Sequence, residues 1–313
     1  MKIVDSTQVS ELLDRIPVFD VIEKMFKALG KGEAVQPPQV QTVFPKDAGD
    51  FINYSGIWSE AGVYGIKTSP YIVTSAKPVI TAWTLLMSMK TGRPLLLVDA
   101  GALTLERTAA TSALAVKLLA KPDAKKLVVI GSGSQALAHI RYVKTLRDWE
   151  TIAVWSPNLE QKSSLTAFTQ LDSRVRFASD KASALKEADV VMLCTSAAEP
   201  VIDVEELHQK ALITSISTNA YRAHEIDPKA LASMDVYCDC KEATIGHAGE
   251  MVIAAEKFAW NPDAVKGDLG ALLNNQCAKP DYSKHVFFRS IGQGLEDVAC
   301  AVAVLTKLNE EEM

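Results

Sequence analysis

The pattern of apolar and polar residues changes near Lys121-Pro122. Beyond this point, short apolar runs alternate with stretches of helical character. Continuous apolar strands joined by helices are typical of a parallel sheet covered on both faces. The pattern therefore predicts a doubly wound, Rossmann-type α/β domain, with strands at residues 127–130, 152–155, 175–177, 190–194, 212–216 and 236–238.

The first third of the chain has a less regular pattern. Residues 18–29 predict an amphipathic helix. A second helix is expected over 104–119, with Thr104 as its cap. Strands lie between the two helices, and the last pair is joined by a tight turn, which indicates antiparallel pairing and an α+β domain. These strands are predicted at residues 40–44, 63–67, 80–88 and 94–99.

The last amphipathic stretch, residues 290–308, predicts a helix that returns to the first domain, because the Rossmann sheet is expected to be complete before it. We therefore predict two domains. Residues 1–120 with 290–313 form a discontinuous α+β domain, and residues 121–289 form the Rossmann domain.

A glycine-rich turn follows the first predicted Rossmann strand. In the pattern GxGxxA, Gly131 allows the tight turn, Gly133 lets the backbone approach a pyrophosphate, and Ala136 lets helix and strand pack closely. The helix start offers unpaired N–H groups to phosphates. Alone the motif is a weak signal, but the ordered strands after it favour a dinucleotide site formed by Gly131, Ser132, Gly133, Ser134, Gln135 and Ala136.

Cofactor preference depends on the end of the second strand. An NAD-selective site usually carries Asp or Glu there, and this chain has Ser156. A neutral residue does not repel a 2′-phosphate, although no arginine follows directly to bind one. We expect NADPH to be preferred and NADH to be used as well. Further cofactor contacts are expected from loops after the strands, at Asn158, Thr195, Ser196 and Ser217.

Composition narrows the classes of protein. The 313 residues are 48% hydrophobic and 23% charged, which suits a globular enzyme. A net charge of -5 gives no support to a nucleic-acid partner. The apolar stretches are too short to span a membrane, and the start lacks a signal-like run, so we expect a cytoplasmic protein. The five cysteines do not form a disulfide framework, and no histidine or cysteine spacing predicts a metal site.

A second motif precedes the glycine-rich turn. Residues 103–110 read Leu-Thr-Leu-Glu-Arg-Thr-Ala-Ala, and the GxGxxA turn follows. The pair resembles the ornithine cyclodeaminase and μ-crystallin family, whose signature is LTxxRTAA followed by GxGxQA. Residues 65–67 and 288–292, with Glu296 and Asp297, are similar to other blocks of that family. The resemblance covers nearly the whole chain.

The resemblance implies a homodimer that reduces or forms imines of cyclic or α-amino acids, with the first domain binding substrate and forming the dimer. It implies that Arg107 binds the substrate carboxylate, since a bidentate pair fixes position and orientation. Arg107 and Thr108 would also approach the cofactor. Lys67, at the end of a predicted strand, resembles the active-site lysine. Without the family, Arg107 would be a solvated helix residue and Lys67 an ordinary strand end.

Two positions depart from the family pattern. Gln39 stands where an arginine usually contacts the carboxylate, and Asn219 stands where cyclodeaminases carry Asp. Amine oxidation and deamination need a base, which an amide cannot supply. Reduction of a preformed imine needs only protonation and hydride delivery, and Asn219 can hydrogen-bond the imine nitrogen.

These departures favour the Δ1-pyrroline-2-carboxylate reductase branch of the family. The expected products are L-proline and, from Δ1-piperideine-2-carboxylate, L-pipecolate, which suggests a place in proline and hydroxyproline metabolism. Two alternatives stay open. One is an ornithine cyclodeaminase or alanine dehydrogenase-like enzyme, and the other is a non-catalytic, μ-crystallin-like binding protein.

Overall fold

The computed structural model describes residues 1–75, 79–157, 159, 165–218 and 221–312. The chain divides into two compact units. Unit 1 comprises Met1–Arg107 and Gly292–Met313, and unit 2 comprises Thr108–Ile291. The division falls inside helix α3 (Gly101–Leu119) rather than after it, so the boundaries differ from those expected at residues 120 and 290.

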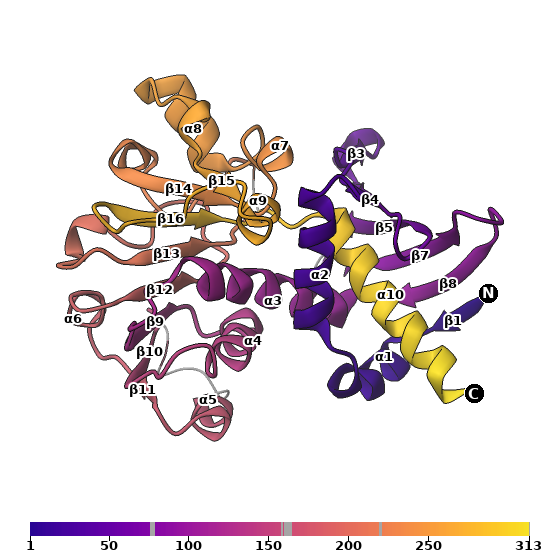
Figure 1. Cartoon of the computed structure of the whole chain (residues 1–313), viewed down its shortest axis with the longest axis horizontal. Helices are drawn as coiled ribbons and strands as arrows, with labels where there is room; N and C mark the ends of the chain where they lie inside the picture. Colours follow the sequence, from indigo (N-terminus) through magenta and orange to yellow (C-terminus); the bar gives the residue numbers. More distant parts are fainter. Residues whose placement is uncertain (76–78, 158, 160–164, 219–220, 313) are drawn as a thin grey trace. The chain divides into compact units, whose positions relative to one another are not determined.

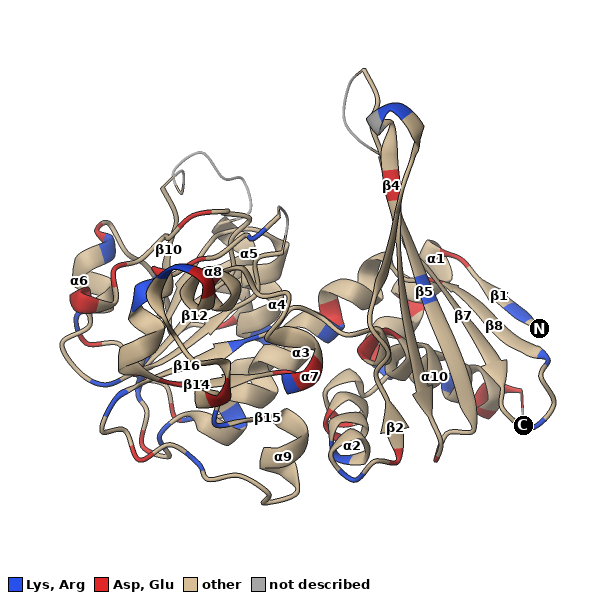
Figure 2. Cartoon of the chain, turned by 90° about the horizontal axis from the view of Figure 1, so that it is seen from above, with Lys and Arg blue, Asp and Glu red and all other residues tan. Residues whose placement is uncertain are grey.

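Unit 1 is built on a mixed sheet with the order β1-β8-β7-β5-β4-β2, in which β3 also pairs with β4 and β6 with β5. Among the described strand pairs of this sheet, only β1–β8 is parallel. Strands β4 and β5 are long, and Figure 2 shows their paired ends extending beyond the other strands as an arm. The strands are β1 (Lys2–Val4), β2 (Ala34–Val35), β3 (Val40–Val43), β4 (Gly49–Trp58), β5 (Val63–Ile72), β6 (Val79–Ile80), β7 (Trp83–Ser88) and β8 (Pro94–Asp99).

Helices α1 (Ser6–Leu12), α2 (Val18–Gly30) and α10 (Gly294–Glu311) complete unit 1. Helix α10 lies across strands β4 and β5 and beside α2 (Figure 1). Two glycines permit its close approach. A Cβ on Gly56 would lie 2.8 Å from the Leu295 Cα, and one on Gly65 would lie 2.6 Å from a Val298 methyl group. The missing side chains therefore let the helix that carries Glu296 and Asp297 pack directly on the sheet.

Several expected elements of unit 1 differ in the structure. The predicted strand 80–88 is two strands, β6 and β7, and β4 was not predicted. Helix α3 begins at Gly101 and not at Thr104, because the Asp99 carboxylate accepts the Gly101 N–H at 3.0 Å and starts the helix earlier. Strand β5 continues to Ile72, so Lys67 lies inside the strand and not at its end.

Unit 2 contains a parallel sheet with the order β11-β10-β9-β12-β13-β16-β14-β15. This confirms the Rossmann-type α/β class. The strands are β9 (Lys126–Ile130), β10 (Thr151–Trp155), β11 (Val175–Phe177), β12 (Val190–Leu193), β13 (Leu212–Ser215), β14 (Met234–Cys238), β15 (Gly267–Asp268) and β16 (His285–Arg289). The helices include α4 (Ser134–Val143), α5 (Leu165–Leu171), α6 (Lys181–Leu185), α7 (Lys241–Thr244), α8 (Gly249–Phe258) and α9 (Leu269–Leu273).

Strand β16 was not predicted, although the sheet is complete at Arg289, before the last helix, as expected. It lies between β13 and β14 and pairs with both. The strand is fully buried, and its neighbours come from earlier in the chain. It therefore brings Arg289, its last residue, to the centre of the sheet edge where β13 ends.

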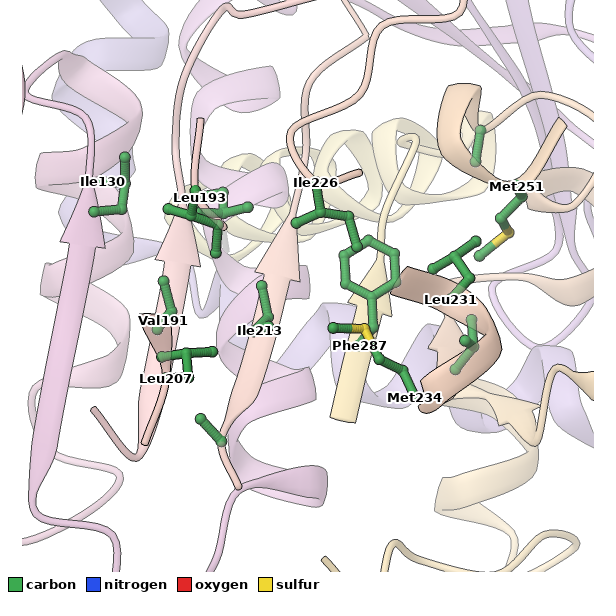
Figure 3. Close-up of a cluster of buried hydrophobic side chains, with 14 of the residues drawn as sticks. Ile130, Val191, Leu193, Leu207, Ile213, Ile226, Leu231, Met234, Met251 and Phe287 are labelled. Carbon is green, nitrogen blue, oxygen red and sulfur yellow. The ribbon is translucent and has the colours of Figure 1, made fainter. Parts of the chain in front are cut away.

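One face of this sheet forms a continuous hydrophobic core. In Figure 3 the strand side chains Ile130, Val191, Leu193, Ile213 and Phe287 lie together, and the chain after β13 covers them. The covering side chains are Ile226, Leu231 and Met251, and Met234, the first residue of β14, belongs to the same cluster. Burial of this apolar surface fixes the strand ends at which the site is built. In the described part of the chain, no helix is both long and apolar enough to cross a membrane.

Candidate active site

Unit 2 contains a groove at the carboxyl ends of β9, β10 and β12. Its volume is about 640 Å³, and it is lined by Ile130, Gly131, Ser132, Gly133, Ser134, Gln135, Trp155, Ser156, Pro157, Cys194, Thr195, Ser196, Ala197 and Val201. In open parallel sheets, ligands bind at the strand ends where the strand order reverses. Here the order reverses between β9 and β12, and the groove lies at that point.

The glycine-rich turn forms the floor of this groove. Gly131 has φ +126, and a Cβ there would lie 2.4 Å from the Cys194 carbonyl oxygen. Helix α4 begins at Ser134 with Gly133 as an extended N-cap, and no described side chain caps its first turn. The unpaired N–H groups and positive dipole of such a turn favour a phosphate. The turn therefore has the shape and the donors that a dinucleotide pyrophosphate needs.

The predicted cofactor residues fall into three groups. The groove is lined by Gly131, Ser132, Gly133, Ser134, Gln135, Ser156, Thr195 and Ser196. Four residues are not among its lining: Arg107, Thr108, Ala136 and Ser217. Ala136 is fully buried in α4, where it lets the helix pack, and Ser217 donates its hydroxyl to the Ala197 carbonyl at 2.5 Å. Asn158 lies outside the described residues.

Unit 1 contains a buried cluster of charged side chains. The Lys67 Nζ atom lies 2.8 Å from Asp297 Oδ2, and the Arg107 Nε atom lies 3.2 Å from Asp297 Oδ1. Arg107 Nη1 is also 3.5 Å from a Glu296 carboxylate oxygen. The Lys67 side chain is 4% exposed and that of Asp297 is 1% exposed. One carboxylate thus holds two cations side by side, one from β5 and one from α3.

Burial and charge act in opposite directions on these cations. Burial lowers the pKa of Lys67, and the nearby Asp297 carboxylate only partly offsets this. Burial also opposes charge on Arg107, but Asp297 and Glu296 outweigh it and raise its pKa. Arg107 is therefore a permanent cation, whereas Lys67 loses its proton more easily than an exposed lysine.

Tyr54 completes the cluster and was not identified from the sequence. It pairs with Lys67 across β4 and β5, and the Lys67 ammonium lies 4.3 Å from its ring centroid. Burial raises the pKa of the Tyr54 hydroxyl, with Arg107 opposing the shift. Tyr54 is therefore a neutral phenol near pH 7, beside a cation.

Gly292 shapes the same cluster from the beginning of the last segment. It has φ +79, and a Cβ there would lie 2.2 Å from Arg107 Nη1. Any side chain at this position would push the guanidinium away from Asp297. The close approach of the Arg107 guanidinium thus explains why a glycine stands before the helix that carries the two carboxylates.

Of the two positions that depart from the family pattern, the structure describes only Gln39. Gln39 is exposed in the segment between β2 and β3, one residue before β3 begins, and it belongs to neither strand. Asn219 lies outside the described residues.

Another group of buried polar residues was missed by the sequence analysis. Glu225, Glu250 and Arg289 are each 1% exposed or less and lie in unit 2. Their neighbours are strand ends from distant parts of the sequence, so no local pattern marks them. Among the residues the structure describes, no group of three or more His, Cys, Asp and Glu side chains could hold a metal ion.

The chain belongs to the ornithine cyclodeaminase/mu-crystallin family, whose sequence profile matches residues 1–312. It is 52% identical over 302 residues to an NAD(P)H-dependent anabolic L-arginine dehydrogenase of Pseudomonas aeruginosa, with 96% of each chain covered. It is 27% identical over 318 residues to a Δ1-pyrroline-2-carboxylate reductase of Colwellia psychrerythraea, covering 98% of this chain and 99% of that one.

The fold is that of a solved structure from Thermococcus litoralis. This is a Δ1-pyrroline-2-carboxylate reductase in complex with NADH and L-proline, and the TM-score is 0.90. The match covers 100% of this chain and 99% of the other, at 22% sequence identity. The likeness confirms the fold class inferred from the sequence.

Proposed function

We propose that the protein is an NAD(P)H-dependent oxidoreductase that reduces a 2-imino acid to the L-amino acid. The observation that carries the proposal is the buried pair Lys67 and Arg107, held together by Asp297 in unit 1. Two adjacent cations suit a carboxylate, and the groove of unit 2 suits a dinucleotide. A C=N group beside a carboxylate is the substrate that this combination fits.

The residues of unit 1 bind and orient the acid. Arg107 has five N–H donors, and its contacts with Asp297 and Glu296 use Nε and Nη1, so the guanidinium can still bind a carboxylate. Lys67 adds a second positive charge and lies inside a strand, which fixes its position. Asp297 orients both cations and limits their mutual repulsion.

Nicotinamide supplies a hydride when the dinucleotide is bound. The hydride would add to the α-carbon of the protonated C=N group, whose double bond becomes single, and the amine so formed would take one further proton from solvent to give the ammonium group. Since an imine is partly protonated near neutral pH, Asn219 needs only to hydrogen-bond the nitrogen. Such a neutral bond contributes about 0.5–1.5 kcal/mol.

We propose a substrate with a basic, open side chain, as in the imine of L-arginine. The 52% identity to the L-arginine dehydrogenase over 96% of both chains supports this choice. Cyclic ketimines are the second candidate, and the reductase relative at 27% identity supports it. Gln39 and Asn219 also favour it, because they replace the arginine and acid of the cyclodeaminases.

The substrate is tested by following oxidation of NADPH and of NADH with a panel of acids. The panel contains 2-oxo-5-guanidinopentanoate with ammonium, Δ1-pyrroline-2-carboxylate, Δ1-piperideine-2-carboxylate and, for ammonia release, L-ornithine. We expect the highest kcat/KM with the guanidino acid and with NADPH. A higher value with either cyclic imine would replace the first candidate by the second. Ammonia release from ornithine at a rival rate would instead indicate a cyclodeaminase.

A non-catalytic binding role is the third possibility, and the same assays address it. The intact Lys67, Arg107 and glycine-rich turn support catalysis, since a protein that only binds an acid would have no use for a hydride donor as well. Absence of cofactor oxidation with every acid of the panel, at enzyme concentrations that bind NADPH, would contradict the proposed function.

We also propose a homodimer in which unit 1 supplies the interface. The arm and its edge strands expose apolar side chains, with Val43 of β3 60% and Ile80 of β6 64% exposed. Exposed apolar edge strands need a cover. Sedimentation at micromolar concentration should give twice the chain mass of 33.9 kDa. Ile80→Lys should shift it toward the monomer, whereas Phe258→Lys, at an exposed position of unit 2, should not.

A further inference from the structure

Glu225 is a fully buried carboxylate that accepts five hydrogen bonds in unit 2. One oxygen accepts the N–H of Thr195 at 3.0 Å and its hydroxyl at 2.6 Å. The other accepts the Ser215 hydroxyl at 2.8 Å and the N–H groups of Ile216 and Ser217 at 3.0 and 3.1 Å. The carboxylate therefore joins the segments that follow β12 and β13.

The backbone around Glu225 is fixed as well. Its own carbonyl accepts the Val201 N–H at 2.9 Å. The next residue, Ile226, is fully buried in the core cluster shown in Figure 3. The side chain consequently has little freedom to follow a moving partner, and it holds its partners where the core places them.

A buried ion pair also contacts the segment that follows β13. The Arg289 Nε atom lies 2.9 Å from a Glu250 oxygen, and both side chains are 1% exposed or less. Arg289 also donates to the Ser217 carbonyl at 2.5 Å and to the Ala223 carbonyl at 3.3 Å. Ser217 is thus held at its N–H by Glu225, at its carbonyl by Arg289 and at its hydroxyl by Ala197.

These contacts shape one wall of the dinucleotide groove. Thr195 and Ala197 line it, and Thr195 Oγ1 accepts the Ala197 N–H at 3.1 Å while donating to Glu225. In this topology the adenosine lies toward β10 and the nicotinamide toward β12 and β13. The wall that Glu225 holds is accordingly the one at the nicotinamide end.

We propose that Glu225 is a positioning residue for the nicotinamide end of the cofactor. It acts through Thr195, Ala197 and Ser217 and does not line the groove itself. The inference rests on the cofactor part of the proposed function and is independent of the imino acid. It explains a buried carboxylate without an ion-pair partner within 4 Å among the described residues, because five donors take the place of a counter-ion.

The chemistry of the position makes Glu225→Gln the informative change. An ionised carboxylate only accepts hydrogen bonds, whereas an amide brings two N–H donors to a site where every partner is a donor. At least one contact must break and one wall segment must move. Asp239→Asn is the matched control. Asp239 is equally buried and accepts the N–H groups of Cys240 and Ile291 at 2.9 and 2.8 Å, but it does not line or hold the groove.

The experiment compares two probes by calorimetric titration without any imino acid. NADPH reports the whole groove, and 2′-phospho-ADP-ribose reports the part without nicotinamide. For Glu225→Gln we expect the Kd of NADPH to rise about tenfold, as loss of one buried charge-assisted bond implies. The Kd of 2′-phospho-ADP-ribose should stay within about twofold. Asp239→Asn should change neither Kd, and thermal unfolding measures the loss of stability in both variants.

An equal rise for both probes would overturn the inference, since Glu225 would then only support the fold. An unchanged Kd for NADPH would overturn it too. Should Glu225→Gln fail to fold, Glu225→Asp keeps the charge but is one methylene shorter, and the same split between the probes is expected. Failure of the wild type to bind NADPH would instead contradict the proposed function, so the two failures are distinguishable.

Discussion

The dinucleotide groove and the charged cluster of unit 1 are built on opposite principles. The groove is lined by glycine and by uncharged polar and apolar residues, and its floor comes from one continuous stretch, residues 131–135. The cluster consists of side chains from three separate regions of the sequence: the hairpin β4–β5, helix α3 and helix α10. The groove is therefore sensitive to atoms that are added, and the cluster is sensitive to groups that are removed.

Charge is treated differently in the two regions. In the cluster, two cations and two carboxylates are buried together, and each depends on the others for compensation. In the groove, the start of helix α4 lines the floor with its partial positive charges, and the buried Glu225 and Arg289 hold the wall from behind. Substitutions in each region should therefore fail in distinct ways.

The largest effect is expected for Arg107→Met. Loss of a buried, charge-assisted contact with the substrate carboxylate is worth about 2–4 kcal/mol, or about 30- to 1000-fold in kcat/KM for the acid. The Kd of NADPH should stay unchanged, because Arg107 belongs to unit 1 and is not in the groove. Steady-state kinetics and titration measure the two quantities.

Two further variants control this test. Lys117→Met makes a similar change at an exposed position of the same helix and should leave kcat/KM unchanged. Arg107→Lys keeps the charge beside Asp297 and guards against a variant that does not fold. Equal losses for acid and cofactor in both Arg107 variants would mean that the arginine is only structural.

Gly131→Ala should have the next largest effect, on the other region. The added Cβ would meet the Cys194 carbonyl oxygen at 2.4 Å, and φ +126 is strained for any side chain. A strained backbone position costs about 1–3 kcal/mol, so the Kd of NADPH should rise about 5- to 150-fold. Gly133→Ala is the comparison for the protein without cofactor, because a Cβ there meets nothing within 4 Å and should leave thermal unfolding unchanged. If Gly131→Ala bound NADPH normally, the turn would not serve as the phosphate site.

The different construction of the regions also explains what the sequence could predict. The groove is made from one local motif and regular βαβ alternation, so the residue pattern predicts both the groove and the Rossmann-type class. The residue pattern does not predict the charged cluster of unit 1. Arg107 and Lys67 were singled out only through family motifs, and Tyr54 was missed because its position depends on the β4–β5 register.

Two missed strands show the same limit. Residues 285–289 are a short apolar run after a long irregular segment, and the strand enters between β13 and β14, out of sequence order. Strand β4 contains Asn53, Ser55 and Gly56, which weaken its pattern. Its face is decided by packing against α10, and not by its own sequence. Glu225 and Arg289 acquire their roles only after these strands are paired.

Lys67→Met should have a smaller, pH-dependent effect. Burial lowers the pKa of Lys67 from its ordinary value of 10.5, so activity that needs the ammonium group should fall as pH rises toward that value. In the variant, the fall of activity at high pH, the alkaline limb of the pH–rate profile, should disappear. Its kcat at neutral pH should be about tenfold lower than that of the wild type. Because the folded state releases this proton first, the contribution of Lys67 to stability rises with pH in the same window.

The exposed Lys90, in the turn between β7 and β8, gives a matched control for that variant. Lys90→Met should keep both the alkaline limb and kcat. A pH–rate profile with the same alkaline limb in Lys67→Met would assign that limb to another group.

The smallest effect concerns the choice between NADPH and NADH. It is expected at Ser156, where this chain has a neutral residue in place of an acidic one. Ser156 lines the groove after β10, where the adenosine ribose is expected. Ser156→Asp places a carboxylate near the 2′-phosphate of NADPH, and two like charges about 4 Å apart and fully surrounded by water repel by about 1 kcal/mol. The ratio of kcat/KM for NADPH to that for NADH should therefore fall about fivefold.

Ser156→Ala removes the hydroxyl without adding charge and should leave the ratio unchanged. Higher salt should shrink the effect of Ser156→Asp, because an exposed charge pair is screened. A ratio that does not respond to Ser156→Asp at low salt would place the ribose away from β10. The topological assignment of the adenosine and nicotinamide ends, on which the role of Glu225 depends, would then need to be reversed.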